Sequence, residues 1–352
     1  MSTSIPKNTT IGIDCRFARF HAGIGSYTRQ LVEALTALDS KAAIVLFVFS
    51  KKEAWLDGIH NVKIIEFSVK HYSLAEQLKF PSVIKNSDVD LMLFTQFNVP
   101  ARCPVPYVVT VHDLTLHTHP GNVSLIKKTG YRFLMKYAVT HAQHVIAVSN
   151  FTKRELQRIY GETVANKTTV VHHGVHSNFT PQPQKVINKT KEKYQLRKPY
   201  LLYVGGSKVH KNIPFLIDVF TEANIKEQLV LVSGGPGVEQ LTLPKNVKWL
   251  QNVPDEDLPG LYSGARCFVT ASLLEGFGLI VAEAESCNCP VIAMMGSSID
   301  EVASDEAILL PPQRQHWLKA LKQLPPKPLQ RPVWKWKTAA QKTMNVLTNA
   351  IT

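Results

Sequence analysis

The sequence predicts an α/β protein with two doubly wound parallel sheets, arranged as two domains of similar size. Strand-sized runs rich in Val and Ile alternate with longer helix-compatible segments along the whole chain. The 352 residues are enough for two domains that each bury a core. Hydrophobic residues make up 45% of the chain and charged residues 19%, which is typical of a folded globular protein and excludes a disordered one.

The order of these runs gives the domain boundaries. In the first half we expect strands in TIGIDCR, AIVLFVF, VDLMLFT, PYVVTVHD and HVIAVS. The polar stretch HSNFTPQPQKVINKTKEKYQLRK is typical of an interdomain linker. Strands resume in PYLLYVGG, LVLVSGG, VKWLQ, CFVTAS and PVIAM, and WKWKTAAQKTMNVLTNAI has the spacing of a helix. We therefore predict a first domain over residues 1–185, a second over 186–332 and a closing C-terminal helix over 333–352.

Composition limits where in the cell the protein is expected and which kinds of partner it is expected to bind. No apolar run reaches the roughly 18 residues of a transmembrane helix, and the N-terminus lacks the pattern of a secretory signal, so we expect a cytoplasmic protein. The five cysteines have neither metal-binding nor disulfide spacing, and we expect core thiols. The net charge of +13 indicates a polyanionic partner, which motifs must identify as nucleic acid, an anionic lipid surface or a phosphorylated substrate.

The first glycine corner follows TIGID, where Gly23 and Gly25 lead into an amphipathic helix. Glycines let a backbone approach a ligand, and the free N–H groups at a helix start suit a phosphate, although a plain tight turn explains the pair equally well. Thr28 occupies the third glycine position of the dinucleotide fingerprint. The missing fingerprint argues against a nicotinamide-dependent oxidoreductase.

The second corner follows the strand YLLYV and is basic. Gly206 is followed by Lys208, His210 and Lys211 immediately before a predicted helix. Such a run is commonly a solvated surface, but at the end of a strand and the start of a helix it is placed to bind a diphosphate.

The third corner, TASLLEGFGLIVAEAES, carries Glu275 and Glu283 with seven residues between them. Glu275 precedes the helix and can project toward a ligand. Glu283 lies early in the helix and could accept hydrogen bonds from a diol such as a ribose, or it could stabilise the N-terminus of its own helix. An ordinary buried crossover needs neither carboxylate, so the pair indicates a polar ligand.

His112 ends the strand PYVVTVHD, and it is either a hydrogen-bond donor to a substrate or a polar strand end. HDLTLHTH and VHHGVH are rich in His but lack a carboxylate at a convincing metal-ligand spacing. We expect no metal site.

Taken together, the segments resemble the retaining glycosyltransferases of the two-domain GT-B fold that carry a Glu-x7-Glu motif (family 4, group 1). The resemblance extends in particular to the bacterial mannosyltransferases of lipopolysaccharide and capsule assembly. GIGSYTRQL, VTVHDL, VSNFTKREL, HHGV, YVGG, HKN, GARCFVTASLLEGFGLIVAEA and EVASDEAILLPP occur in that family's order and spacing. The resemblance implies two Rossmann-like domains that face each other across a cleft.

The resemblance also implies roles for individual residues. Glu275 would contact the hydroxyls of the donor sugar and His112 would lie beside that sugar, which makes these two the candidate catalytic residues. Glu283 would bind the nucleotide ribose and Lys211 the diphosphate. The other candidate donor-binding residues are Gly23, Gly25, Gly206, His210, Phe277, Gly278 and Leu279.

Three positions depart from the family's commoner pattern. His210 stands where many relatives have Arg, and it lacks the permanent forked charge of a guanidinium. Gln96 replaces a frequent His, and His176 replaces an Asp.

We therefore expect a metal-independent transferase without a cofactor, which moves a sugar from a nucleotide-sugar donor to a hydroxyl of a glycan or lipid-linked acceptor. GDP-mannose is the favoured donor, and no nucleic-acid partner is expected. UDP- or ADP-sugar transfer and a nucleotide-sugar epimerase on the same fold are the alternatives. A nonenzymatic basic binding protein would explain the charge but not the Glu pair.

One predicted helix, in SLIKKTGYRFLMKYAVTHA, carries a basic stripe. Lys128, Arg132 and Lys136 recur every four residues. The apolar residues Ile126, Phe133, Leu134 and Tyr137 fall largely on another side. The stripe is either a solvated face or a site for peripheral attachment to an anionic membrane, such as the inner face of the cell membrane.

Overall fold

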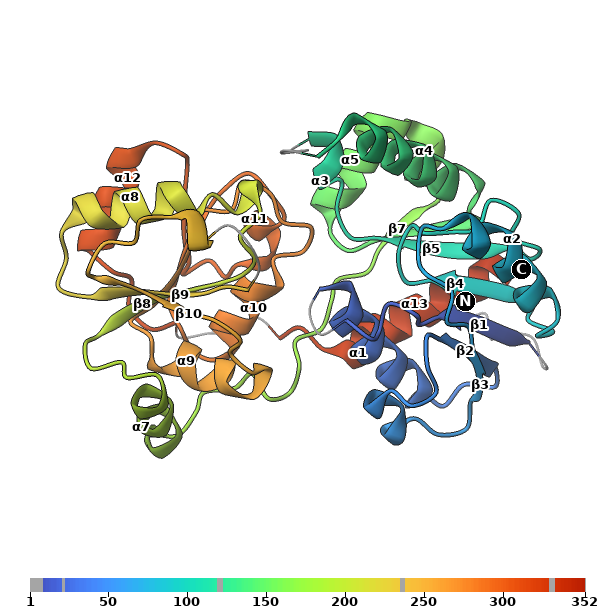
Figure 1. Ribbon diagram of the computed structural model, residues 1–352, viewed down its shortest axis with the longest axis horizontal. Helices are drawn as coiled ribbons and strands as arrows, with labels where there is room; N and C mark the ends of the chain where they lie inside the picture. The colour runs from blue at the N-terminus through green and yellow to red at the C-terminus, as the bar shows by residue number, and fades with distance from the viewer. Residues whose placement is uncertain (1–8, 21–22, 119–122, 235–237, 329–332, 352) are drawn as a thin grey trace. The chain divides into compact units, whose positions relative to one another are not determined.

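The computed structural model describes residues 9–20, 23–118, 123–234, 238–328 and 333–351. The chain forms two compact units, of which the first comprises residues 1–174 and 335–352 and the second residues 175–334 (Figure 1). Within the described residues, every strand pairs with its sheet neighbours in parallel, and the predicted fold class is confirmed. No helix in these ranges is both long and apolar enough to cross a membrane.

The sheet of the first unit has the strand order β3-β2-β1-β4-β5-β6-β7. Its strands are β1 (Thr10–Asp14), β2 (Ala43–Val48), β3 (Lys63–Glu66), β4 (Leu91–Phe94), β5 (Tyr107–Val111), β6 (His144–Ala147) and β7 (Thr168–Val170). The helices and 3-10 turn are α1 (Ile24–Thr36), η1 (Ala54–Gly58), α2 (Leu74–Lys85), α3 (Thr115–Thr118), α4 (Leu125–His141), α5 (Asn150–Tyr160), α6 (Glu162–Asn166) and α13 (Trp336–Ile351).

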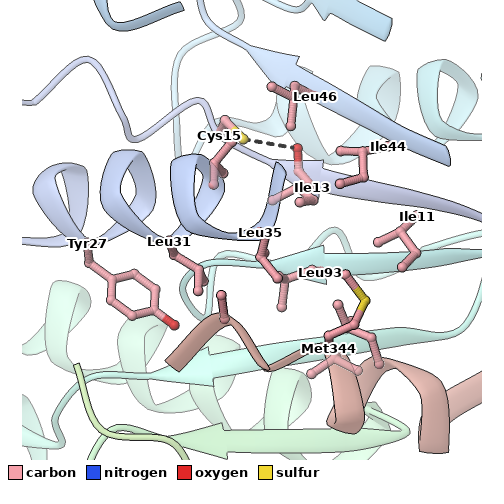
Figure 2. Packing of buried hydrophobic residues seen from close by; sticks show 14 of the residues in the cluster. Ile11, Ile13, Cys15, Tyr27, Leu31, Leu35, Ile44, Leu46, Leu93 and Met344 are labelled. Carbon is pink, nitrogen blue, oxygen red and sulfur yellow. Dashed lines mark hydrogen bonds between the residues drawn. The ribbon is translucent and has the colours of Figure 1, made fainter. Parts of the chain in front are cut away.

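Alternate residues of the central strands enter two separate core clusters, one on each face of this sheet. On one face, Leu31 and Leu35 of α1 and Met344 of α13 pack against Ile11 and Ile13 of β1 (Figure 2). The closing helix α13 thus completes the core of the first unit, alongside α1, although it follows the second unit in the chain (Figure 1). On the opposite face, α2, α4 and α5 bury apolar side chains against the sheet.

The sheet of the second unit has the order β10-β9-β8-β11-β12-β13. Its strands are β8 (Tyr200–Val204), β9 (Gln228–Val232), β10 (Val247–Leu250), β11 (Cys267–Thr270), β12 (Val291–Met294) and β13 (Ile308–Leu310). The helices and 3-10 turns are α7 (Gln184–Lys193), η2 (Val209–Lys211), α8 (Ile213–Ala223), η3 (Val238–Gln240), η4 (Asp255–Asp257), α9 (Leu258–Gly264), α10 (Leu279–Ser286), α11 (Ile299–Val302) and α12 (Arg314–Lys322).

The structure differs from the predicted elements in three ways. The Lys-rich stretch read as a linker forms α7, because Ile187 and Thr190 bury one side of that helix against α9. The division between the units falls between Gly174 and Val175, ahead of this helix. The sequence reading also missed β3, β7 and β13, which are only three or four residues long and lie at sheet edges.

Each sheet has one place where the strand order reverses its direction. In the first unit it lies between β1 and β4, and in the second between β8 and β11. Ligands of open α/β sheets bind beyond the carboxyl ends of the strands at such a switch point. The loops after these four strands are therefore where a site is expected.

Candidate functional site

The loop after β8 is held in place by hydrogen bonds to two of its backbone carbonyls. Tyr203 Oη donates a hydrogen bond to the carbonyl of Gly206 at 2.9 Å. Asn212 takes a left-handed conformation with φ of 53° and joins η2 to α8. The buried His210 accepts, through its carbonyl, a hydrogen bond from the N–H of Leu273 at 2.8 Å. Because Leu273 follows β11, this bond joins the two loops of the switch point.

An ion pair connects the same two loops. Lys211 Nζ lies 2.6 Å from Glu275 Oε1, and their side chains are only 16% and 11% exposed. Ser298 Oγ donates to the carbonyl of Glu275 at 2.8 Å and fixes its backbone. The sequence named both residues as candidates but gave no indication that they pair. A charge-assisted bond this sheltered from water orients both groups.

Helix α10 starts directly after the second loop. Gly278 has φ of 85°, a conformation that favours glycine, and an added Cβ there would lie 3.2 Å from Ile299 Cγ1. The ring of Phe277 is buried and packs edge-on against Trp334, with 5.4 Å between ring centroids, so this side chain is part of the buried interior. The first turn, from Leu279, leaves backbone N–H groups without helical partners, as at any helix N-terminus. These N–H groups suit an anion.

Glu283 lies beyond the first turn of α10 and is half-buried. Burial raises the pKa of its carboxyl to about 8; a hydrogen bond from Tyr262 Oη at 3.3 Å opposes this rise, and Asp255 adds to it. No acidic residue lies in the first turn of α10, so Glu283 is not placed to stabilise the N-terminus of its own helix and that alternative is wrong. With a pKa of about 8, this carboxyl keeps its proton near neutral pH.

His112 follows β5 in the first unit and is half-buried. Its Nε2 lies 2.9 Å from the carbonyl oxygen of Thr95, which can only accept, so Nε2 carries the hydrogen. Burial lowers the pKa of the ring, and Tyr27 packs edge-on against it at 4.6 Å. A neutral His112 therefore presents Nδ1 as an acceptor, whereas the sequence reading considered a donor to substrate.

Gly23, which precedes α1, and Gly25, in its first turn, are required for different reasons. Gly23 has φ of 61° and open space around its Cβ position, whereas a Cβ on Gly25 would lie 2.0 Å from the carbonyl oxygen of Phe20. Arg29 Nη1 holds that carbonyl at 2.7 Å. Close packing of the loop against α1 is thus sufficient to explain Gly25, with or without a ligand.

The positions that depart from the family's pattern have ordinary contacts. Gln96 is buried, and its Oε1 accepts from Tyr72 Oη at 3.3 Å. His176 Nδ1 accepts from the N–H of Asn178 at 3.2 Å. Among the residues that the structure describes, no three His, Cys, Asp or Glu side chains gather as a metal site would require. Metal independence stays a prediction, since no measurement tests it.

Sequence reasoning missed a buried charge network at the other switch point. Arg16, fully buried after β1, lies 2.7 Å from Asp14 and 2.7 Å from Glu76, with its guanidinium over the ring of Phe80 at 4.0 Å. Asn98, after β4, donates to Glu76 at 2.8 Å. No local motif signals a network whose members come from separate loops. It fixes the loops after β1 and β4.

Two family models match the chain, one over each unit. The model of Glycosyltransferase Family 4 matches residues 21–179, and the model of Glycosyl transferases group 1 matches residues 185–336. The O-antigen chain mannosyltransferase B of Escherichia coli is 32% identical over 58% of this chain and 57% of its own length. The O-antigen chain mannosyltransferase RfbU of Salmonella typhimurium is 30% identical over 61% of this chain and 60% of its own length. The matches thus cover less than two thirds of either relative.

Solved structures with the same fold are more distant in sequence. A sucrose-phosphate synthase from Thermosynechococcus elongatus superposes with a TM-score of 0.72 at 20% identity, over 98% of this chain and 95% of that one. Anabaena Alr3699/HepE, solved with UDP-glucose, gives a TM-score of 0.71 at 19% identity, over 97% and 93%. WaaG, a glycosyltransferase of lipopolysaccharide biosynthesis, gives 0.67 at 12% identity, over 97% and 94%. With a matching model over each unit, the chain belongs to the GT-B glycosyltransferases of family 4, group 1.

Proposed function

We propose that the protein transfers a mannosyl group from GDP-mannose to a hydroxyl of a glycan or lipid-linked acceptor, with retention at the anomeric carbon and without a metal. Both curated relatives above are O-antigen chain mannosyltransferases, which supports mannose as the sugar. Their names do not specify the nucleotide, so the choice of GDP rests on the resemblance alone.

The observation that carries the proposal is the Lys211–Glu275 pair at the β8/β11 switch point. Departure of a nucleoside diphosphate leaves negative charge that the enzyme must stabilise as it develops. Lys211, two residues before α8, and the backbone N–H groups at the start of α10 are groups of the required sign. Glu275, held through Ser298 and Lys211, would accept hydrogen bonds from sugar hydroxyls.

Glu283 would bind the ribose. A carboxylate can accept from both hydroxyls of a diol, whereas the protonated form that burial favours has less acceptor capacity. Nucleotide binding should therefore release a proton from Glu283. His112 keeps its proposed place beside the donor sugar, now as an acceptor through Nδ1.

In the proposed reaction the bond from the anomeric carbon to the phosphate oxygen breaks, and a bond to the acceptor oxygen forms on the same face. The departing phosphate takes the proton of the acceptor hydroxyl. This front-face course follows from the family resemblance.

A thermal-shift panel tests the proposal. GDP, UDP, ADP and their sugar conjugates are compared, and the conjugate that stabilises the protein most is incubated with glycan acceptors. We expect GDP and GDP-mannose to give the largest shifts and the product to be an α-mannoside. A larger shift with UDP would mean that the donor is a UDP-sugar. A new nucleotide-sugar formed without any glycoside would indicate an epimerase. If no nucleotide raised the melting temperature, the proposal would be refuted.

A further inference from the structure

The excess positive charge is concentrated in one unit. The first unit contains 23 Lys and Arg against 12 Asp and Glu, a balance of +11. The second contains 17 against 15, a balance of +2. The proposed donor-binding groups Lys211, Glu275 and Glu283 belong to the second unit, so binding of a phosphorylated donor there does not explain the charge.

Large apolar side chains are exposed in the same unit. Leu74 and Leu78 on α2, and Leu125, Ile126 and Phe133 on α4, are each 66 to 86% exposed. By helical spacing, Ile126 and Phe133 lie on a different side of α4 from its basic stripe. That side is not the one packed against the sheet, because α4 buries Tyr131, Met135, Ala138 and Val139.

The loop between β4 and β5 contacts both helices. The N–H of Ala101 donates to Gln77 Oε1 of α2 at 2.8 Å, and its carbonyl accepts from Tyr137 Oη of α4. Phe97, in the same loop, contacts the ring of Tyr131 edge-on with 5.0 Å between centroids. We call the exposed residues of α2 and α4 the α2–α4 surface.

The same surface is basic. Lys127, Arg132 and Lys136 of α4 are exposed beside Ile126 and Phe133, and no Asp or Glu occurs between Leu114 and Arg154. Lys79 is exposed next to Leu78 on α2. Exposed apolar side chains interleaved with Lys and Arg are the composition of helices that lie in a membrane interface.

We propose that the α2–α4 surface docks on an anionic lipid bilayer, with its Leu, Ile and Phe side chains inserted among the lipids and its basic side chains against the headgroup phosphates. The sequence suggested attachment by charge alone, whereas the exposure of Ile126 and Phe133 adds an insertion step. A nucleic acid would satisfy the basic residues but would leave five large apolar side chains in water. The proposal does not depend on the transferase activity.

The test is cosedimentation with vesicles of phosphatidylcholine containing phosphatidylglycerol, without any sugar substrate. Wild type should bind, and Ile126→Ser with Phe133→Ser should lower partitioning by about tenfold or more at both low and high salt, because insertion is not screened. Arg132→Gln with Lys136→Gln should weaken binding at about 0.1 M salt, and the loss should shrink at about 1 M.

Val186→Ser on α7 is the matched control for apolar truncation, since α7 is also Lys-rich and Val186 is exposed. Lys51→Gln with Lys52→Gln, exposed in the first unit but outside α2 and α4, controls for charge removal. Circular dichroism confirms folding of each variant. The proposal is overturned if wild type ignores the vesicles, if the Ile126 and Phe133 double variant binds like wild type, or if the controls lose as much.

Discussion

Replacing Glu283 by Gln is expected to stabilise the ligand-free protein and to weaken nucleotide binding. The carboxyl has a pKa of about 8 in the folded chain, against an ordinary value of 4.5, mainly because it is buried. The unfolded chain therefore releases this proton first as pH rises. Stability attributable to Glu283 is fully present below about pH 4.5 and is lost as pH rises through about 8.

The magnitude follows from the same two values. At about 1.36 kcal/mol per pH unit, the interval from 4.5 to 7 corresponds to at most about 3.4 kcal/mol. The side chain is half-buried and keeps some contact with water, so we expect about 2 kcal/mol. For a domain of this size that is a rise of about 4–8 °C in melting temperature at pH 7. A Gln retains an oxygen for Tyr262 and carries no charge to desolvate.

The assay is thermal unfolding of wild type and Glu283→Gln at pH 4.5, 7 and 8.5, with the exposed Glu256→Gln as a control for general loss of charge. The advantage of the Glu283 variant should be small at pH 4.5 and grow with pH. A variant that melts at or below the wild-type temperature at pH 7 would refute the reasoning from burial.

Calorimetry with GDP tests the second part of the prediction, which is weaker nucleotide binding. Glu283→Gln should bind about tenfold or more weakly, because a hydrogen bond to a charged group is worth about 1.5–3 kcal/mol. Wild-type affinity should rise between about pH 6 and 8 as the carboxyl ionises, whereas the variant should show no such rise. Unchanged GDP affinity would remove Glu283 from the ribose site.

Three further predictions concern the loops of the switch point and the metal. Glu275→Gln should lower turnover by about 100-fold or more, the scale of one lost transition-state contact, while the fold persists because the amide keeps an oxygen near Lys211; near-normal turnover would exclude Glu275 from the site. Lys211→Ala should weaken binding of GDP more than of guanosine, since about 1.5–3 kcal/mol is lost only where phosphates are present, and calorimetry showing equal losses would contradict a phosphate contact. Activity should survive EDTA, and inhibition reversed by one divalent ion alone would show that a metal is required.

Much of the fold was readable from the sequence. Strands of a parallel sheet are buried on both faces and appear as continuous Val- and Ile-rich runs, which identified ten of the strands in order. The short strands β3, β7 and β13 were missed because pairing with a neighbour, rather than their own pattern, makes them strands. The helix α7 was missed because Ile187 and Thr190 are its only buried residues, and a polar sequence does not show which partner covers them.

The chemistry of the site divides in the same way. The sequence by itself determined which residue types stand at the strand-to-helix corners, because each corner is one continuous stretch of the chain. Tertiary structure alone decided that Lys211 pairs with Glu275, that burial raises the pKa of Glu283, and that His112 donates a hydrogen bond to the carbonyl of Thr95. It also decided that Ile126 and Phe133 face solvent. Pairing, desolvation and exposure depend on neighbours that come from distant parts of the chain, and a linear sequence does not specify those neighbours.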